Sequence, residues 1–384
     1  MPTQNAHKWI TNGNRAIEYG ATEFVWQISS GVLVGASAND AVRSLNNGST
    51  LSNFGHIFSG NGYGVVFEGS DSTITNHVGA VIDGNFAGLL ITDIVANVTN
   101  HGSILSSEGL GLFFGADSRL IEVTNTGEIW GKLAGILALF DGGKINNSGL
   151  IHSPDFGVSS GPSIGFTNTL INSGTIKAPK EAVSSDGGRL VFEDTGTVQG
   201  LVDFDASAGN VNDVVVNKGT ITGTVSLGPG NDKFDGKGGT SGTVFGQAGN
   251  DKLSGGDKAD DLRGGGGEDT LRGALGADDL RGGAGRDFFD YNSIAEAGKG
   301  SKRDEIFDFS HSQKDKIDLS DIDAKTGIGG NQKFTFIGTK AFSGEKGELR
   351  CKSGLIQGDV NGDGKADFEI KMNVSTLVAN DFVL

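Results

Sequence analysis

The chain has 384 residues, of which 65 are glycine and 5 are proline, and its formal net charge is −16. This acidic balance makes nucleic acid and anionic membrane surfaces poor partners and favours cations. A single cysteine, Cys351, excludes a disulfide framework. The longest nearly apolar stretch, residues 133–140, is far too short to span a bilayer. Abundant glycine without a collagen period indicates a turn-dense repeat protein.

Residues 1–27 are predicted to form an N-terminal lead-in or cap. The first ten residues contain no basic segment followed by an apolar run, so no N-terminal signal peptide is expected.

Residues 28–225 contain a recurring motif of asparagine, any residue, glycine, any residue and an aliphatic residue. Complete copies begin at Asn53, Asn100, Asn125, Asn147, Asn172 and Asn217, and degenerate copies run from Asn76 to Val81, with one extra residue, and from Asp194 to Val198. The spacing of about 22–25 residues is too long for a hexapeptide repeat, and the glycine content is too high for helical repeats. A right-handed parallel β-helix with one coil per repeat is therefore predicted.

Each coil is expected to turn at its Asn-x-Gly segment, because asparagine and glycine tolerate the left-handed backbone conformation. The following aliphatic residue should point inward and stack on its equivalent in the next coil. About eight or nine coils must stack, since a single coil cannot bury its own core. The asparagine column has two interpretations, a hydrogen-bonded ladder or a binding site, and the ladder is favoured.

The role of the β-helix stays open between three hypotheses. Its coils resemble the passenger repeats of large secreted adhesins, which suggests a structural or adhesive rod. It could instead be an enzyme such as a lyase or epimerase of acidic polysaccharides, or a scaffold without a binding role. No cluster of carboxylates with lysine, arginine or histidine stands out, so no catalytic or cofactor-binding residue is assigned. His77 and His101 occupy the same turn position in adjacent coils and are expected to be exposed.

Residues 226–290 carry a sharper repeat of nine residues. Five units follow one another from Gly246 to Asp290 with the pattern G-G-x-G-x-D-x-U-x, in which U is large and apolar. Position six is occupied by Asp251, Asp260, Asp269, Asp278 and Asp287, and position eight by Leu253, Leu262, Leu271, Leu280 and Phe289. An outlying copy, Gly228–Phe234, supplies Asp232.

Short strands on opposite sides of a flattened coil would use two units per coil, so turns 18 residues apart should stack. This places Asp251, Asp269 and Asp287 in one column and Asp260 and Asp278 in another. Stacked carboxylates repel one another without a counter-ion, and glycine lets backbone carbonyls turn toward them. Such a cage of oxygen ligands suits several Ca²⁺ ions better than zinc or copper.

The predicted calcium ligands include turn glycines as well as aspartates. They are Asp232, Asp251, Asp260, Asp269, Asp278 and Asp287 with Gly249, Gly265, Gly267, Gly276, Gly283 and Gly285. Lys258 and Ala274 replace glycines of the pattern in the second column. At least one site of that column is therefore expected to be loose or empty.

The array is similar to the RTX, or hemolysin-type, calcium-binding repeats. The residues that carry the resemblance are Asp269-Thr-Leu271, Gly276-Ala-Asp278-Asp-Leu280, Gly282-Gly283 and Asp287. The resemblance implies a parallel β-roll that is filled with calcium.

Residues 291–384 resemble the C-terminal domain of serralysin-type secreted metalloproteases. The matching segments are Asp304–Phe309, Asp315–Ser320, Phe334–Gly338, Gly347–Arg350 and Asp359–Phe368. The resemblance implies a β-sandwich-like module, with Asp304 and Asp308 as further calcium ligands. The ending Asp381-Phe-Val-Leu384 resembles a signal for type I (ABC transporter) export. The His-Glu-x-x-His motif of the protease occurs nowhere in the 384 residues, so protease activity is not expected.

The segment Asp359-Val-Asn-Gly-Asp363-Gly364 begins like an EF-hand loop. The twelfth position would be Ile370, where a bidentate glutamate is needed. A hairpin turn is the favoured interpretation over a calcium loop.

The sequence thus predicts an all-β, secreted, extracellular calcium-binding protein. Its repeats should stay unfolded in the calcium-poor cytosol and fold on Ca²⁺ after type I export. The expected partners are the export machinery and an extracellular polysaccharide or cell surface. The alternative is an extracellular polysaccharide-modifying enzyme that uses the β-helix face.

Overall fold

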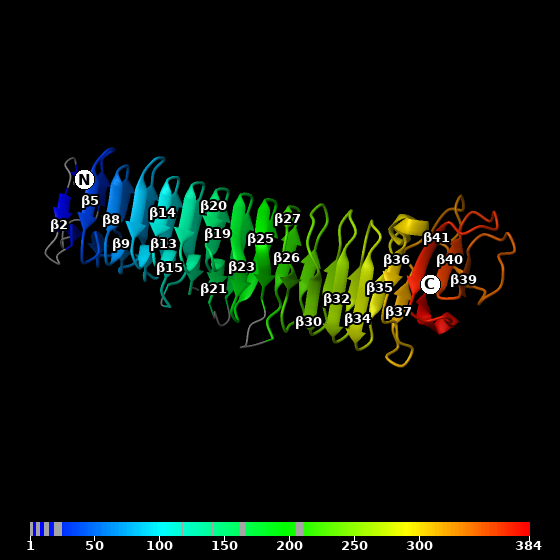
Figure 1. The fold of residues 1–384 in the computed structure, drawn as a ribbon. Helices are drawn as coiled ribbons and strands as arrows, with labels where there is room; N and C mark the ends of the chain where they lie inside the picture. The colour runs from blue at the N-terminus through cyan, green and yellow to red at the C-terminus, as the bar shows by residue number, and fades with distance from the viewer. Residues whose placement is uncertain are drawn as a thin grey trace. The chain divides into compact units, whose positions relative to one another are not determined.

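The computed structural model describes residues 3–4, 8–10, 15–18, 25–116, 118–139, 141–161, 166–204 and 210–384. The chain divides into two compact units. Unit 1 comprises Met1–Gly209 and Gly219–Gly223, and unit 2 comprises Asn210–Lys218 and Thr224–Leu384. Short, mostly parallel β-strands form both units, which confirms the predicted all-β solenoid (Figure 1). Much of the expected lead-in, residues 1–27, lies outside the described residues.

Unit 1 is a stack of coils. Each complete coil contributes one strand to each of three faces, and the strands within a face pair in parallel. The first face consists of β1 (Thr3–Gln4), β4 (Val25–Ile28), β7 (Thr50–Asn53), β10 (Ser72–Asn76), β13 (Ala96–Asn100), β16 (Ile121–Asn125), β19 (Lys144–Asn147), β22 (Thr167–Asn172) and β24 (Arg189–Asp194). The second consists of β2 (Lys8–Ile10), β5 (Leu33–Ala36), β8 (His56–Ser59), β11 (Val81–Gly84), β14 (Ser103–Ser106), β17 (Glu128–Gly131), β20 (Leu150–His152), the start of β23 (Thr175–Ser185), the start of β25 (Thr197–Asp203) and β27 (Thr220–Ile221). The third consists of β3 (Ile17–Glu18), β6 (Val42–Ser44), β9 (Tyr63–Phe67), β12 (Ala87–Ile91), β15 (Leu110–Phe114), β18 (Ala134–Ala138), β21 (Phe156–Ser160) and the ends of β23 and β25.

The aliphatic residue that follows each Asn-x-Gly turn points into the core of unit 1, as predicted. Ile57, Ile104 and Ile129 are fully buried, and their strands pair in register. One copy differs from the prediction: Ile82 rather than Val81 occupies this column, between Ile57 and Ile104. The reason is a longer turn that contains Gly79, whose φ of 77° is left-handed.

The asparagine column is a hydrogen-bonded ladder, as the favoured interpretation predicted. In each coil the side-chain Nδ2 donates to the Oδ1 of the next member at 2.7–2.9 Å. The members are Asn53, Asn76, Asn100, Asn125, Asn147, Asn172 and, as the last acceptor, Asp194. All are at most 2% exposed. Asparagine can fill such a column because its amide is both a donor and an acceptor.

Unit 2 is a flatter stack with two facing parallel sheets. One sheet contains β26 (Val214–Asn217), β29 (Lys233–Asp235), β31 (Lys252–Ser254), β33 (Thr270–Arg272), β35 (Phe288–Asp290), β37 (Lys316–Asp318) and β42 (Phe382–Val383). The other contains β28 (Val225–Ser226), β30 (Val244–Ala248), β32 (Asp261–Gly266), β34 (Asp279–Ala284), β36 (Asp304–Ile306) and β41 (Phe368–Met372). Position eight of the nine-residue units fills the space between the sheets, because all five residues there are at most 1% exposed.

The last part of unit 2 adds an antiparallel meander to the second sheet. The strands β39 (Glu348–Lys352), β40 (Leu355–Asp359) and β41 pair antiparallel in that order, and β38 (Thr335–Phe336) pairs parallel to β39. Helical turns are confined to α1 (Ile294–Ala297), η1 (Gly300–Lys302) and η2 (Ala379–Asp381) in the part of the chain that the structure describes. None of these turns is long enough to cross a membrane.

Breaking the asparagine ladder is expected to lower the stability of unit 1. In Asn100→Ala, the Asn76 amide loses an acceptor and the Asn125 carbonyl loses a donor, both in the buried interior. We expect the free energy of unfolding of unit 1 to fall by at least about 1–3 kcal/mol. The matched control is Asn97→Ala, in the exposed position of the same strand, which should change it by less than about 0.5 kcal/mol. Denaturant titration would measure both, and equal effects would contradict the role of the ladder.

Candidate metal centre

One column of buried aspartates runs along the turns on one side of unit 2. The Oδ1 atom of each accepts the backbone N–H of the preceding member, at 2.8 Å from Asp232 to Asp251, 2.8 Å from Asp251 to Asp269 and 3.0 Å from Asp269 to Asp287. The same contact continues to Asp315 at 3.1 Å. The predicted first column thus comes together, and Asp315 extends it beyond the nine-residue array.

A second, shorter column lies on the opposite side of unit 2. Asp260 donates its N–H to Asp278 Oδ1 at 2.9 Å, and Asp278 donates to Asp304 Oδ1 at 3.0 Å. Asp308 accepts from the N–H groups of Gly282 and Gly283, each at 2.9 Å. The structure therefore places Asp304 in line with the predicted second column and Asp308 against the turn of the last unit.

The other carboxylate oxygen of most column members has no partner. The Oδ2 atoms of Asp232, Asp251, Asp269, Asp278, Asp287 and Asp304 are buried without a hydrogen bond. A buried ionised carboxylate is costly unless it is paired. Burial is accordingly the main cause that raises the pKa of these groups, to about 6 for Asp251, about 7 for Asp269, Asp278 and Asp287, and about 8 for Asp232 and Asp304. Neighbouring aspartates raise most of these pKa values further.

The first glycine of each unit leaves space for these unpartnered oxygens. A Cβ atom on Gly264 would lie 2.2 Å from Asp269 Oδ2 and 2.6 Å from the carbonyl oxygen of Gly282. Gly246 has the same relation to Asp251 Oδ2, at 2.3 Å, and to the carbonyl oxygen of Gly264, at 2.6 Å. In successive coils, an unpartnered carboxylate oxygen and a main-chain carbonyl oxygen therefore both lie close to the first glycine of the unit.

The glycines that were predicted as ligands shape the turns. Left-handed or related positive φ values, between 105° and 135°, occur at Gly249, Gly265, Gly267, Gly283 and Gly285. Side chains at these positions would be strained and would also collide with the carbonyl groups of the coil before. Gly276 has a different role, since its Cβ would lie 2.3 Å from Asp278 Oδ1 and 2.5 Å from the Lys258 carbonyl oxygen.

These donors fit a hard cation that takes ligands from several coils. Within the described residues, no three histidine, cysteine, aspartate or glutamate side chains gather as a metal-binding group. The available set is instead one carboxylate oxygen per coil together with backbone carbonyls. Ca²⁺ accepts such a mixture, with six to eight oxygen ligands in flexible geometry, whereas zinc prefers nitrogen and sulfur.

The second column departs from the regular pattern at its first member. The N–H of Gly256 donates to Asp260 Oδ2 at 2.8 Å, so this oxygen is already satisfied by its own turn. Ala274, which replaces a glycine, adopts a φ of 67° that is uncommon for a residue with a side chain. These features agree with the expectation of a weaker site here, which stays a prediction.

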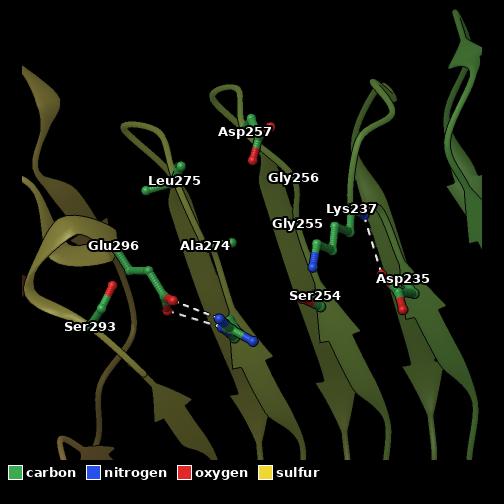
Figure 2. Close-up of a pocket in the computed structure, with 11 residues that line it drawn as sticks. Asp235, Lys237, Ser254, Gly255, Gly256, Asp257, Ala274, Leu275, Ser293 and Glu296 are labelled. Atoms are coloured by element: carbon green, nitrogen blue, oxygen red, sulfur yellow. Dashed lines mark hydrogen bonds and ion pairs between the residues drawn. The ribbon is translucent and has the colours of Figure 1, made fainter. Parts of the chain in front are cut away.

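A cleft of about 380 Å³ opens beside these irregular turns (Figure 2). Its lining includes Asp257, Leu275, Lys237 and Glu296. The Arg272 guanidinium donates to both Glu296 carboxylate oxygens, at 3.0 and 2.6 Å, so these two charges neutralise each other.

The segment that begins like an EF-hand loop is a hairpin turn between β40 and β41. Asp359 accepts from the N–H groups of Gly362 and Gly364, at 2.7 and 2.8 Å. Asp367 accepts from the N–H of Val360 at 2.8 Å and from the side-chain amide of Asn361 at 2.8 Å. The carboxylates thus hold the turn together, which supports the favoured interpretation.

Sequence reasoning missed Asp315 as a member of the first column. The signal was present, because Asp315 stands two residues before the buried Ile317, as Asp287 stands two residues before Phe289. Asp315 lies 28 residues after Asp287, so a search with a period of nine or eighteen residues does not find it.

A family model described as peptidase M10 serralysin C terminal matches residues 180–384. No curated protein matches the chain.

The raised pKa values predict how calcium-free unit 2 responds to pH. Each carboxyl has a pKa of about 6–8 in the folded unit, against an ordinary value of 3.8. The folded unit therefore binds more protons than the unfolded chain between these values, and its stability must fall as the pH rises. We expect the dialysed, calcium-free protein to show more β-structure by circular dichroism at pH 5, where these carboxyls are protonated, than at pH 8, where unit 2 should be unfolded. β-Structure that increases with pH in the calcium-free protein would contradict the buried, uncompensated carboxylates.

Proposed function

Since the chain belongs to the peptidase M10 serralysin C-terminal family, we propose that it is a secreted protein whose second unit folds by binding calcium. The observation that carries this proposal is the set of six buried carboxylates, each with one unpartnered oxygen. Calcium at these points would supply the positive charge that the described side chains of the columns lack. Several ions per chain are expected, mainly along the first column.

The aspartate columns make folding conditional on the surrounding calcium concentration. In a calcium-poor compartment the stacked carboxylates repel one another and favour the unfolded chain. Extracellular calcium modules typically bind at about 10⁻⁴–10⁻³ M, so calcium outside the cell would fill even weak sites. Because the unfolded chain has no cage, the free energy of binding becomes free energy of folding.

Such a switch suits export by a type I transporter, which we propose as the partner of the C-terminal segment. In the folded unit Asp381 and Phe382 are buried, and Val383 and Leu384 are half-buried. The strand β42 pairs with β37, Phe382 is 7% exposed, and the centroid of its ring lies 5.0 Å from that of the Phe336 ring. Asp381 accepts from His311 and from the N–H of Val378. An unfolded chain would present this ending in full, and a folded chain would present it only in part.

For unit 1 we propose a structural or adhesive surface that is exposed outside the cell, with polysaccharide as its ligand class. The ladder and the stacked core give it rigidity that needs no ligand. One described cleft of about 380 Å³ is lined by Phe54, His56, Val81 and neighbouring turn residues, without a carboxylate. His77 stacks on Phe54 and His101 hydrogen-bonds Thr126, so the two histidines have separate partners. These features give the alternative of a polysaccharide lyase or epimerase no specific support.

A matched pair of glycine substitutions tests the proposed calcium cage. Gly264→Ala would place a methyl group where Asp269 Oδ2 and the Gly282 carbonyl meet. Gly266→Ala, in the same strand, would find its nearest atom at 3.9 Å. We expect Gly264→Ala to raise the calcium midpoint of folding about tenfold, or about 1.4 kcal/mol, and Gly266→Ala to leave it nearly unchanged. Circular dichroism during calcium titration measures both, and equal midpoints would contradict the cage.

The buried ending predicts that calcium protects the C-terminus from carboxypeptidase. In chelator, Asp381 to Leu384 should be released rapidly, and in millimolar calcium their release should slow by at least about tenfold. Phe382→Ala removes the ring that packs on Phe336 and should restore part of the digestion in calcium. The exposed Val378→Ala serves as the control. If unit 2 folds with calcium but the ending is digested as before, the proposed withdrawal of the export segment is wrong.

A further inference from the structure

A corner of unit 1 contains buried polar side chains that are neutral and hydrogen-bonded. This corner connects the third face of one coil to the first face. In the turn after β6, the hydroxyls of Ser44 and Ser49 are 2.6 Å apart. Two or more coils further on, Ser118 donates to the carbonyl of Ile91, and Asn168 donates to another serine hydroxyl of the corner. Neutral groups of this kind satisfy one another without any ion.

Asp93 introduces a carboxylate into this corner, in the turn between β12 and β13. The residue is 0% exposed, and neither of its carboxylate oxygens has a hydrogen-bond partner in good geometry. The buried Ser72 hydroxyl also lacks a partner. Burial is the largest cause and raises the pKa of Asp93, whereas the Ser72 hydroxyl and the N–H groups of Gly69 and Ser72 lie close enough to lower it.

Among the described residues, the surroundings of Asp93 supply more negative charge. Asp71 lies close enough to raise the pKa of Asp93 further, and no basic side chain among the described residues counters it. Asp71 also has a φ of 58°, a left-handed conformation that is uncommon for residues other than glycine. Two carboxylates and a hydroxyl from the turns of two successive coils thus lie close together.

We propose that Asp93, Ser72 and Asp71 form a calcium site in unit 1 that is separate from the aspartate columns of unit 2. A fully buried carboxylate must be either neutralised by a proton or paired with a cation. The repulsion from Asp71 and the nearby Ser72 hydroxyl favour the cation, because both groups offer oxygen atoms to it. Backbone carbonyls of the turn and water would complete the shell.

The chemistry of the corner selects calcium among common cations. All of the available donors are hard oxygens, which excludes a preference for zinc or copper. Ca²⁺ tolerates irregular geometry, whereas Mg²⁺ demands a nearly ideal octahedron and keeps several waters. A bound ion would join the turns before β10 and β13, and so would fix two successive coils at this corner.

The test compares the number of calcium ions bound by the full chain and by Asp93→Asn. Asparagine keeps the shape of the side chain and removes its charge, and the same corner already accommodates Asn168. Equilibrium dialysis with radioactive calcium should show one ion fewer for Asp93→Asn than for the unchanged chain. The matched control is Asp186→Asn, an exposed aspartate of unit 1, which should lose no ion.

Hydrogen exchange provides a second readout at the site itself. Calcium should slow amide exchange in residues 92–100 of the unchanged chain and have no such effect in Asp93→Asn. If Asp93→Asn binds as many ions as the unchanged chain, Asp93 is a protonated structural group and the proposed site is wrong. That result would leave calcium binding by unit 2 intact, whereas a chain that binds no calcium at all would overturn both proposals.

Discussion

Equivalent side chains of a parallel β-solenoid must stack at the spacing of neighbouring strands, about 4.8 Å. This constraint decides which residues can occupy an inward-facing turn position. Asparagine meets it without help, since its amide donates to one neighbour and accepts from the other. The ladder from Asn53 to Asn172 uses this property through six coils and ends on Asp194, whose Oδ1 accepts while its buried Oδ2 has no hydrogen-bond partner.

Aspartate cannot meet the same constraint alone, because an ionised carboxylate only accepts. In unit 2 the backbone N–H of each column aspartate satisfies one oxygen of the next, as between Asp251 and Asp269. The second oxygen has no donor left and is held beside a glycine carbonyl. One change of residue type at a stacked position thus separates a ladder whose amides satisfy one another from a column whose carboxylates need cations.

The repeats made most of this arrangement predictable from the sequence. The period of the Asn-x-Gly motif predicted that Ile57 and Ile104 occupy one inward-facing column, and the nine-residue period predicted that Leu262 and Leu280 are buried. The exceptions lie where the period fails. Ile82 is displaced by a longer turn, and Asp315 joins its column only after a 28-residue excursion. Asp93 occurs once, so no repeat could have indicated that it is buried beside Ser72.

The central claim is that calcium, through the two aspartate columns, determines whether unit 2 is folded. Hydrogen exchange of the full chain with and without calcium tests it most directly, with magnesium as the control. The account predicts that the amides of residues 232–318 exchange freely in chelator and in magnesium, and become protected at millimolar calcium. Most of unit 1 should be protected under all three conditions. Protection of residues 232–318 that is the same with and without calcium would contradict the account.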